Sequence, residues 1–230
     1  RPGLLTWVYP FDEYHDLALE QARIGEVFFG DWFMRTALNN GLPLNTVVSG
    51  GNFVKALAAK PTRFAGTVLV APTALSGPAA AALATHVRGG GGLLLYGPTA
   101  HLDPALKGIL KLRRGTPLFG DLELDVKIEN DVLTERRHAT KLAHEPLASG
   151  GGIDETESDG GASVQVAATV SKGNERRLYA LVARDSSWRK GAAVAWVRGT
   201  NSFRLPAHKA AHLPEMRDPA LHYYSELLPR

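Results

Sequence analysis

Short apolar runs alternate with segments of helical spacing along the first part of the chain. Residues 3–9 are apolar at nearly every position and stop at Pro10, as expected for a buried parallel strand. Apolar residues then recur at helical spacing over residues 13–40, and a second apolar run at 44–48 predicts another strand. We interpret Ser49-Gly50-Gly51 as a turn at the end of that strand. This alternation is typical of an α/β protein.

The clearest unit is a strand, a helix and a second strand within residues 66–96. The first strand covers residues 66–72, Ser76 can cap a helix over residues 78–88, and residues 93–96 form the second strand after a run of glycines. A connection of this length joins parallel strands and is right-handed in nearly all known proteins. The unit therefore predicts a parallel sheet covered by helices.

The second half of the chain has a less regular pattern. A further helix is expected over residues 103–112, and alternating polar and apolar residues over 122–128 predict a half-exposed strand. The acidic, glycine-rich stretch at 149–161 is interpreted as an exposed loop. An Asp-Pro pair predicts the start of a last helix at 218–228. Three more strands are expected at hairpin-like spacing, at residues 163–170, 177–184 and 192–198.

Charge and composition narrow the possible functions. The 230 residues include 26 Lys and Arg against 23 Asp and Glu, and the basic residues are scattered rather than gathered as a nucleic-acid groove requires. No uninterrupted apolar run reaches the roughly 18 residues that a transmembrane helix needs. The absence of cysteine excludes disulfides, thiolate metal sites and thiol catalysis. We therefore expect a soluble protein, cytoplasmic or secreted, that binds neither nucleic acid nor membranes.

Three groups of residues carry a family resemblance. They are a strand followed by a glycine-terminated helix and a strand, a helix with a glycine turn, and a closing hairpin whose last strand follows a Lys-Gly pair. The groups lie at residues 68–72 with 76–95, at 31–33 with 39–44, and at 166–169, 178–182 and 190–196. Together they resemble the class I glutamine amidotransferase-like domain that follows the catalytic barrel in many bacterial β-galactosidases, also called the trimerisation or middle domain.

The resemblance implies a flavodoxin-like parallel sheet with helices on both faces and an added β-rich segment. It divides the chain into an α/β core at residues 1–118, an irregular insertion without a counterpart at 119–161, and closing strands with a C-terminal helix of the same domain at 162–230. It also implies a bacterial parent glycoside hydrolase, a catalytic barrel in the same or another chain as partner, and a homo-oligomer.

The turn that matches the position of the family's nucleophile lacks the groups that amidotransferase catalysis requires. In active amidotransferases a cysteine follows the strand that matches residues 93–96, paired with a distant histidine and a carboxylate. Here the turn after that strand has no thiol, and Pro98 has no N–H to stabilise an oxyanion. Thr99 and His101 could be a nucleophile and base, but such a pair arises far more often by chance than by function. We therefore expect no catalytic residue and no cofactor.

Other side chains favour a ligand-facing or interface role. His208 and His212 have the spacing of two metal ligands on a helix, but no third ligand is evident, so no metal site is expected. Trp7 and Trp196 lie within apolar strands and are expected in the core, whereas the other tryptophans are flanked by charged residues. The candidate ligand-facing or interface residues are Asp31, Trp32, Ser49, Gly97, Thr99, His101 and Trp188.

Three hypotheses about function follow. The leading one is a non-catalytic structural and assembly domain of a β-galactosidase-like glycoside hydrolase. The second is a free-standing sugar-binding or sugar-modifying protein similar to the ThuA-like group, with ligands at the carboxyl ends of the strands near Pro10, Ser49, Pro72 and Gly97. The third is a cysteine-free hydrolase that uses Thr99 as its nucleophile.

Overall fold

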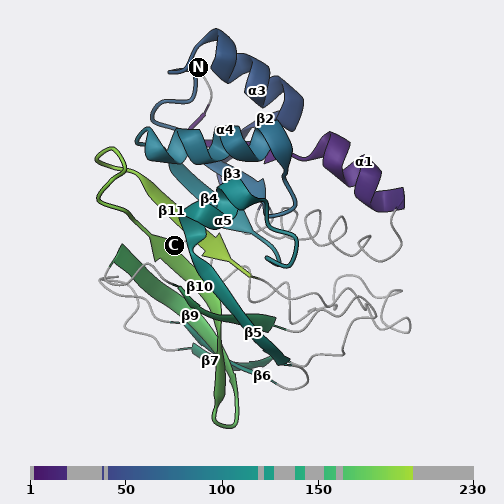
Figure 1. Cartoon of the computed structure of the whole chain (residues 1–230), viewed down its shortest axis with the longest axis vertical. Coiled ribbons are helices and arrows are strands. Elements are labelled where there is room, and N and C mark those ends of the chain that lie inside the picture. The colour runs from purple at the N-terminus through teal and green to yellow at the C-terminus, as the bar shows by residue number, and fades with distance from the viewer. Residues whose placement is uncertain are drawn as a thin grey trace.

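The computed structural model describes the greater part of the chain between residues 3 and 198 (Figure 1). The described residues are 3–19, 38, 41–118, 122–126, 138–142, 153–158 and 163–198. Several sequence predictions lie outside them, namely most of the helical segment at 13–40, the last helix at 218–228, and the candidates Asp31, Trp32, His208 and His212. Within the described residues no helix is long and apolar enough to cross a membrane.

Five parallel strands form the first half of a nine-stranded mixed sheet. In their order across the sheet they are β2 (Leu44–Ser49), β1 (Leu5–Tyr9), β3 (Val68–Pro72), β4 (Gly92–Tyr96) and β11 (Ala193–Val197). Each coincides, apart from one or two residues at its ends, with an apolar run that predicts a strand. The predicted strand–helix–strand unit and its parallel pairing are confirmed for β3 and β4.

Four antiparallel strands complete the sheet. β10 (Glu175–Ala183) pairs with β11, β9 (Val164–Lys172) pairs with β10, and β6 (Leu122–Val126) and β7 (His138–Leu142) follow. The β9–β10 turn contains Gly173, whose φ of 59° is a left-handed conformation that glycine adopts without strain. Figure 1 shows this hairpin extending away from the helices. The structure is therefore a mixed sheet of α/β character and not a purely parallel one.

A separate two-stranded sheet consists of β5 (Leu112–Leu118) and β8 (Ile153–Ser158). The expectation of an exposed acidic loop at 149–161 is wrong for this part of the segment, because Asp154 and Glu155 are buried within β8. The predicted irregular insertion likewise contains β6, β7 and β8, and it is regular where the structure describes it. These acidic residues can be buried because arginines neutralise them, Arg114 of β5 for Asp154 and Arg198 for Glu155.

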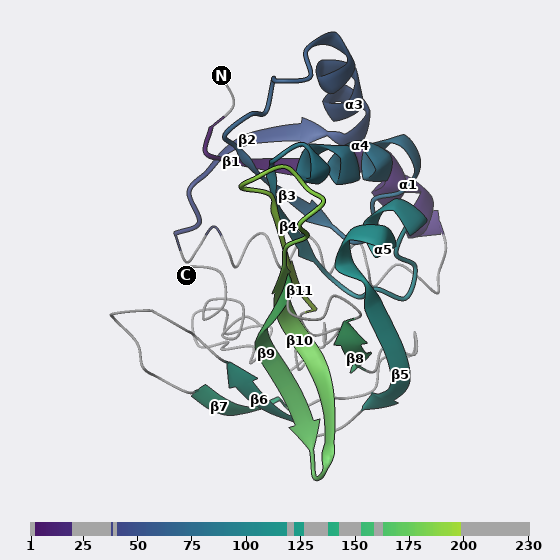
Figure 2. The same cartoon turned by 60° about the vertical axis from the view of Figure 1, so that its left-hand side comes forward.

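Three helices cover one face of the parallel strands, as Figure 2 shows. They are α3 (Gly50–Ala59), α4 (Gly77–Arg88) and α5 (Pro104–Leu110), while α1 (Phe11–Leu19) follows β1. The helices and the strands beneath them share one apolar cluster, which includes Phe53, Leu69, Leu83, Leu95, Leu106 and Trp196. Trp196 is 1% exposed, which confirms its predicted place in the core.

The opposite face of the sheet has its own apolar cluster. Successive residues of a strand point to opposite faces, and along β3 Leu69 belongs to the first cluster and Val70 to the second. In the second cluster, the indole N–H of Trp7 donates to the hydroxyl of Tyr96 at 2.9 Å. Burial raises the pKa of Tyr96 well above its usual value. The central strands are thus covered on both faces, as their continuous apolar runs predict.

The sequence pattern does not predict helix α3. Residues 49–51 are not a simple turn, because Ser49 caps the helix and its hydroxyl accepts a hydrogen bond from the N–H of Asn52 at 3.4 Å. Two consecutive glycines disfavour a helix by propensity. Gly50 nevertheless lies close to α4, since a Cβ atom added to it would be 3.4 Å from the Cβ of Ala79. The packing of α3 against α4 therefore outweighs local propensity.

The predicted helix at 103–112 is present but shorter. The carboxylate of Asp103 caps α5 by accepting a hydrogen bond from the N–H of Ala105 at 2.8 Å. Lys111 adopts a φ of 51°, in the left-handed region that ends a helix. This change of direction starts β5 at Leu112 and carries the chain toward β8.

Ser49 and Ser76 offer a matched test of helix capping. Both are N-cap residues, but Ser49 makes a side-chain capping hydrogen bond and Ser76 makes none. We expect Ser49→Ala to lower the free energy of unfolding by about 0.5–1 kcal/mol, as loss of a capping hydrogen bond typically does. Ser76→Ala should change it by less than about 0.5 kcal/mol. Urea denaturation measures both, and equal losses would contradict the assigned cap.

Candidate functional site

The chain turns sharply after β4, in a segment that we call the β4 bend. It consists of Gly97, Pro98 and Thr99. The N–H of Gly97 donates to the carbonyl of Val197 at 3.0 Å, and the carbonyl of Gly97 accepts from the indole N–H of Trp196 at 3.0 Å. The hydroxyl of Thr73 donates to the carbonyl of Pro98 at 2.6 Å. The polar backbone groups at the start of the β4 bend are therefore occupied by neighbouring strands.

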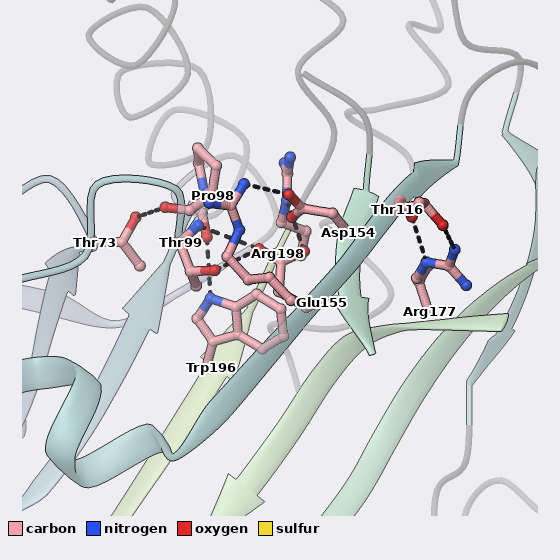
Figure 3. A network of polar contacts seen from close by, with 11 residues as sticks. Thr73, Pro98, Thr99, Thr116, Asp154, Glu155, Arg177, Trp196 and Arg198 are labelled. Atoms are coloured by element: carbon pink, nitrogen blue, oxygen red, sulfur yellow. Dashed lines mark hydrogen bonds and ion pairs between the residues drawn. The ribbon is translucent and has the colours of Figure 1, made fainter. Parts of the chain in front are cut away.

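Glu155 of β8 takes up the remaining donors of the β4 bend (Figure 3). Its Oε1 accepts from the N–H of Thr99 at 3.2 Å and from the hydroxyl of Thr99 at 2.7 Å. Glu155 is 0% exposed and Thr99 is 6% exposed. The single hydroxyl proton of Thr99 is thus held by a buried carboxylate, whereas His101 is exposed. This geometry does not support Thr99 and His101 as a nucleophile and base.

Arg198, which follows β11, supplies the opposite charge. Its Nε lies 3.3 Å from Oε2 of Glu155, and the two side chains are 2% and 0% exposed. The backbone N–H of Arg198 donates to the carbonyl of Tyr179 at 2.7 Å, which holds the residue beside β10. A buried charge is tolerated only when it is paired, and this ion pair neutralises both groups. The carboxylate therefore joins β8, the β4 bend and the end of β11.

One arginine joins the two strands of the small sheet, and another joins this sheet to β10. Arg114 of β5 forms an ion pair with the buried Asp154 of β8. Arg177 of β10 is 7% exposed and donates to the carbonyl and the hydroxyl of Thr116, in β5, at 2.8 and 2.9 Å. Arg177 thus holds β5 against the main sheet and Arg114 holds β8 to β5, so that Glu155 is presented to the β4 bend (Figure 3).

The structure separates most of the described candidate residues. Gly97 and Thr99 lie together in the β4 bend, but Ser49 ends β2, which is separated from β4 by two strands. His101 is exposed in the turn beyond the bend. Trp188 is half-buried and packs against the first apolar cluster. Among the described residues, no three His, Asp or Glu side chains gather as metal ligands.

Two residues that define the site, Glu155 and Arg198, are not among the candidates predicted from the sequence. The acidic residues around position 155 suggested a loop, and Arg198 stood at the end of a predicted strand. A signal was nevertheless present, because the basic pair Arg113 and Arg114 pairs in register with Glu157 and Glu155 across β5 and β8. Opposite charges on adjacent strands favour pairing. Matching the basic pair to the acidic segment would have predicted this small sheet.

Substitution of the buried ion pair tests its contribution to stability. We expect Glu155→Gln, or Arg198→Gln, to lower the free energy of unfolding by about 3 kcal/mol or more, because each leaves one buried charge without its partner. The double variant Glu155→Gln with Arg198→Gln should lose at least about 1 kcal/mol less than the sum of the two single losses. Chemical denaturation of all four proteins measures the coupling, and additive losses would show that the two side chains do not interact.

Comparison with solved structures identifies proteins of similar fold. Gan42B, a GH42 β-galactosidase from G. stearothermophilus, matches 100% of this chain over 30% of its own, with 12% identity and a TM-score of 0.53. A β-galactosidase from Bacillus circulans sp. alkalophilus matches 86% of the chain over 28% of its own, with 10% identity and a TM-score of 0.56. A putative ThuA-like protein from Bacteroides uniformis matches 84% of the chain over 79% of its own, with 13% identity and a TM-score of 0.48.

No protein-family model and no curated protein matches the sequence. The chain spans only about three tenths of the β-galactosidases that it resembles in structure. At these identities the similarity concerns the fold alone. The chain therefore has the α/β fold of one segment of GH42 β-galactosidases.

Proposed function

We propose that this chain is a non-catalytic structural domain of a β-galactosidase-like glycoside hydrolase. The observation that carries the proposal is the occupied β4 bend. Thr99 donates both its N–H and its hydroxyl to Glu155, and Glu155 is in turn paired with Arg198. A nucleophile needs a free hydroxyl or thiol next to a base and an open space for the substrate. In the β4 bend the hydroxyl of Thr99 is engaged by a carboxylate that is itself paired with Arg198, and His101, the base proposed with it, is exposed.

The order of the strands supports the amidotransferase-like interpretation. The sequence β2, β1, β3, β4 and a fifth parallel strand is the order of flavodoxin-like sheets, which bind ligands at the carboxyl ends of their strands. The β4 bend lies at such an end, where the resemblance places the nucleophile of amidotransferases. A buried ion pair in place of a cysteine there is consistent with a domain that keeps the fold and has lost the reaction.

The GH42 β-galactosidases support the proposed context. Their chains are more than three times as long as the segment that this protein matches, so most of each enzyme lies elsewhere. In the proposed parent enzyme, a catalytic barrel in the same or another chain carries the two carboxylates that glycoside hydrolysis requires. The role of this domain is then to pack against the barrel and to contribute to a homo-oligomer.

Activity and binding measurements on the purified chain test the proposal. We expect no hydrolysis of a chromogenic β-galactoside and no heat on titration with neutral mono- and oligosaccharides. Light scattering should detect an oligomer, or a complex once the barrel is added. Hydrolysis that disappears in Thr99→Ala would contradict the proposal and support the hydrolase hypothesis. Saturable heat with a neutral sugar would instead favour a free-standing sugar-binding protein.

A further inference from the structure

A cavity of about 470 Å³ lies beside the β4 bend, on the side of α5 and β5. Its lining residues are Thr99, Ala100, Leu102, Lys107, Leu112, Arg113 and Arg114. Its volume falls within the range of roughly 300–1,000 Å³ typical of small-molecule sites. It also lies near the carboxyl end of β4, where sheets of this kind collect ligands.

The lining of the cavity is positively charged. Lys107, Arg113 and Arg114 contribute three cations, and no acidic side chain is among the lining residues. The cations come from two elements, since Lys107 projects from α5 and the arginines belong to β5. Arginine and lysine side chains that converge on a concave surface are the usual means of binding carboxylate or phosphate groups.

Nearby carboxylates already neutralise part of this charge. Asp154 pairs with Arg114 and Glu155 pairs with Arg198. Asp103, one helical turn before Lys107, accepts backbone hydrogen bonds from Ala105 and Gly77 at 2.8 and 2.9 Å. Arg113 stands opposite Glu157 in the β5–β8 register. Lys107 is consequently the lining cation that we expect to contribute most to the binding of an anion.

The rest of the lining indicates what kind of anion fits. The hydroxyl of Thr99 donates to Glu155, so toward the cavity its oxygen offers only acceptor positions. An O–H group of a ligand satisfies such an acceptor. Leu102 and Leu112 add an apolar surface for the carbon skeleton of the ligand. We propose that the cavity binds a small hydroxylated anion, of the class of sugars that carry a carboxylate or a phosphate.

Calorimetric titration of the purified chain at constant ionic strength tests this site. Galacturonate and galactose 6-phosphate are the probes, and galactose is the neutral comparison. We expect saturable binding of at least one anion and none of galactose. Lys107→Gln should weaken binding by about tenfold, the loss expected for one charge-assisted contact. The two probes distinguish carboxylate from phosphate recognition.

Two exposed basic residues supply matched controls. Lys55→Gln on α3 and Arg63→Gln in the following turns remove the same charges away from the cavity, and each should change affinity by less than about twofold. Absence of anion binding, or equal weakening by the control variants, would overturn the proposed site. Neither result bears on the non-catalytic role, which the neutral sugars test separately.

Discussion

The pairing of Glu155 with Arg198 constrains the arrangement of three separate segments. A carboxylate with no exposed surface must be neutralised and hydrogen-bonded, and here an arginine and the N–H and hydroxyl of Thr99 provide both. Displacement of strand β8, the β4 bend or the end of β11 would leave a charge unpaired in the protein interior. The ion pair therefore specifies how the small sheet docks on the large one.

The same constraint explains why the carboxyl end of β4 has little catalytic potential. In an open α/β sheet this edge is where backbone N–H groups and side chains remain available for a ligand. In this protein, strands from distant parts of the sequence take up those groups. Gly97 and Thr99 of the β4 bend make hydrogen bonds to neighbouring strands, and Pro98 accepts one from Thr73, which directly follows β3. What remains open is the adjacent cavity beneath α5, whose cations suit binding better than bond cleavage.

The parallel strands could be predicted from the sequence, because continuous apolar runs such as 68–72 and 93–96 indicate strands that are buried on both faces. The prediction failed where tertiary contacts oppose local propensity. Two glycines begin helix α3, and their cost is offset only by close packing of Gly50 against α4. The role of Glu155 was not predicted for a similar reason. The polarity of its segment indicates a loop unless its partners in β5 and after β11 are known. The sequence pointed to Gly97 and Thr99 of the β4 bend as candidates, but the contacts that these residues make depend on partners far apart in the sequence.

Hydrogen exchange at the β4 bend measures the central claim most directly. If Glu155 closes the bend, the amide protons of Gly97 and Thr99 should exchange as slowly as those of β4, because their release requires opening of the sheet. Exchange of the Thr99 amide as rapid as that of the exposed turn at Gly173 would show that the bend is open in solution and would contradict the account.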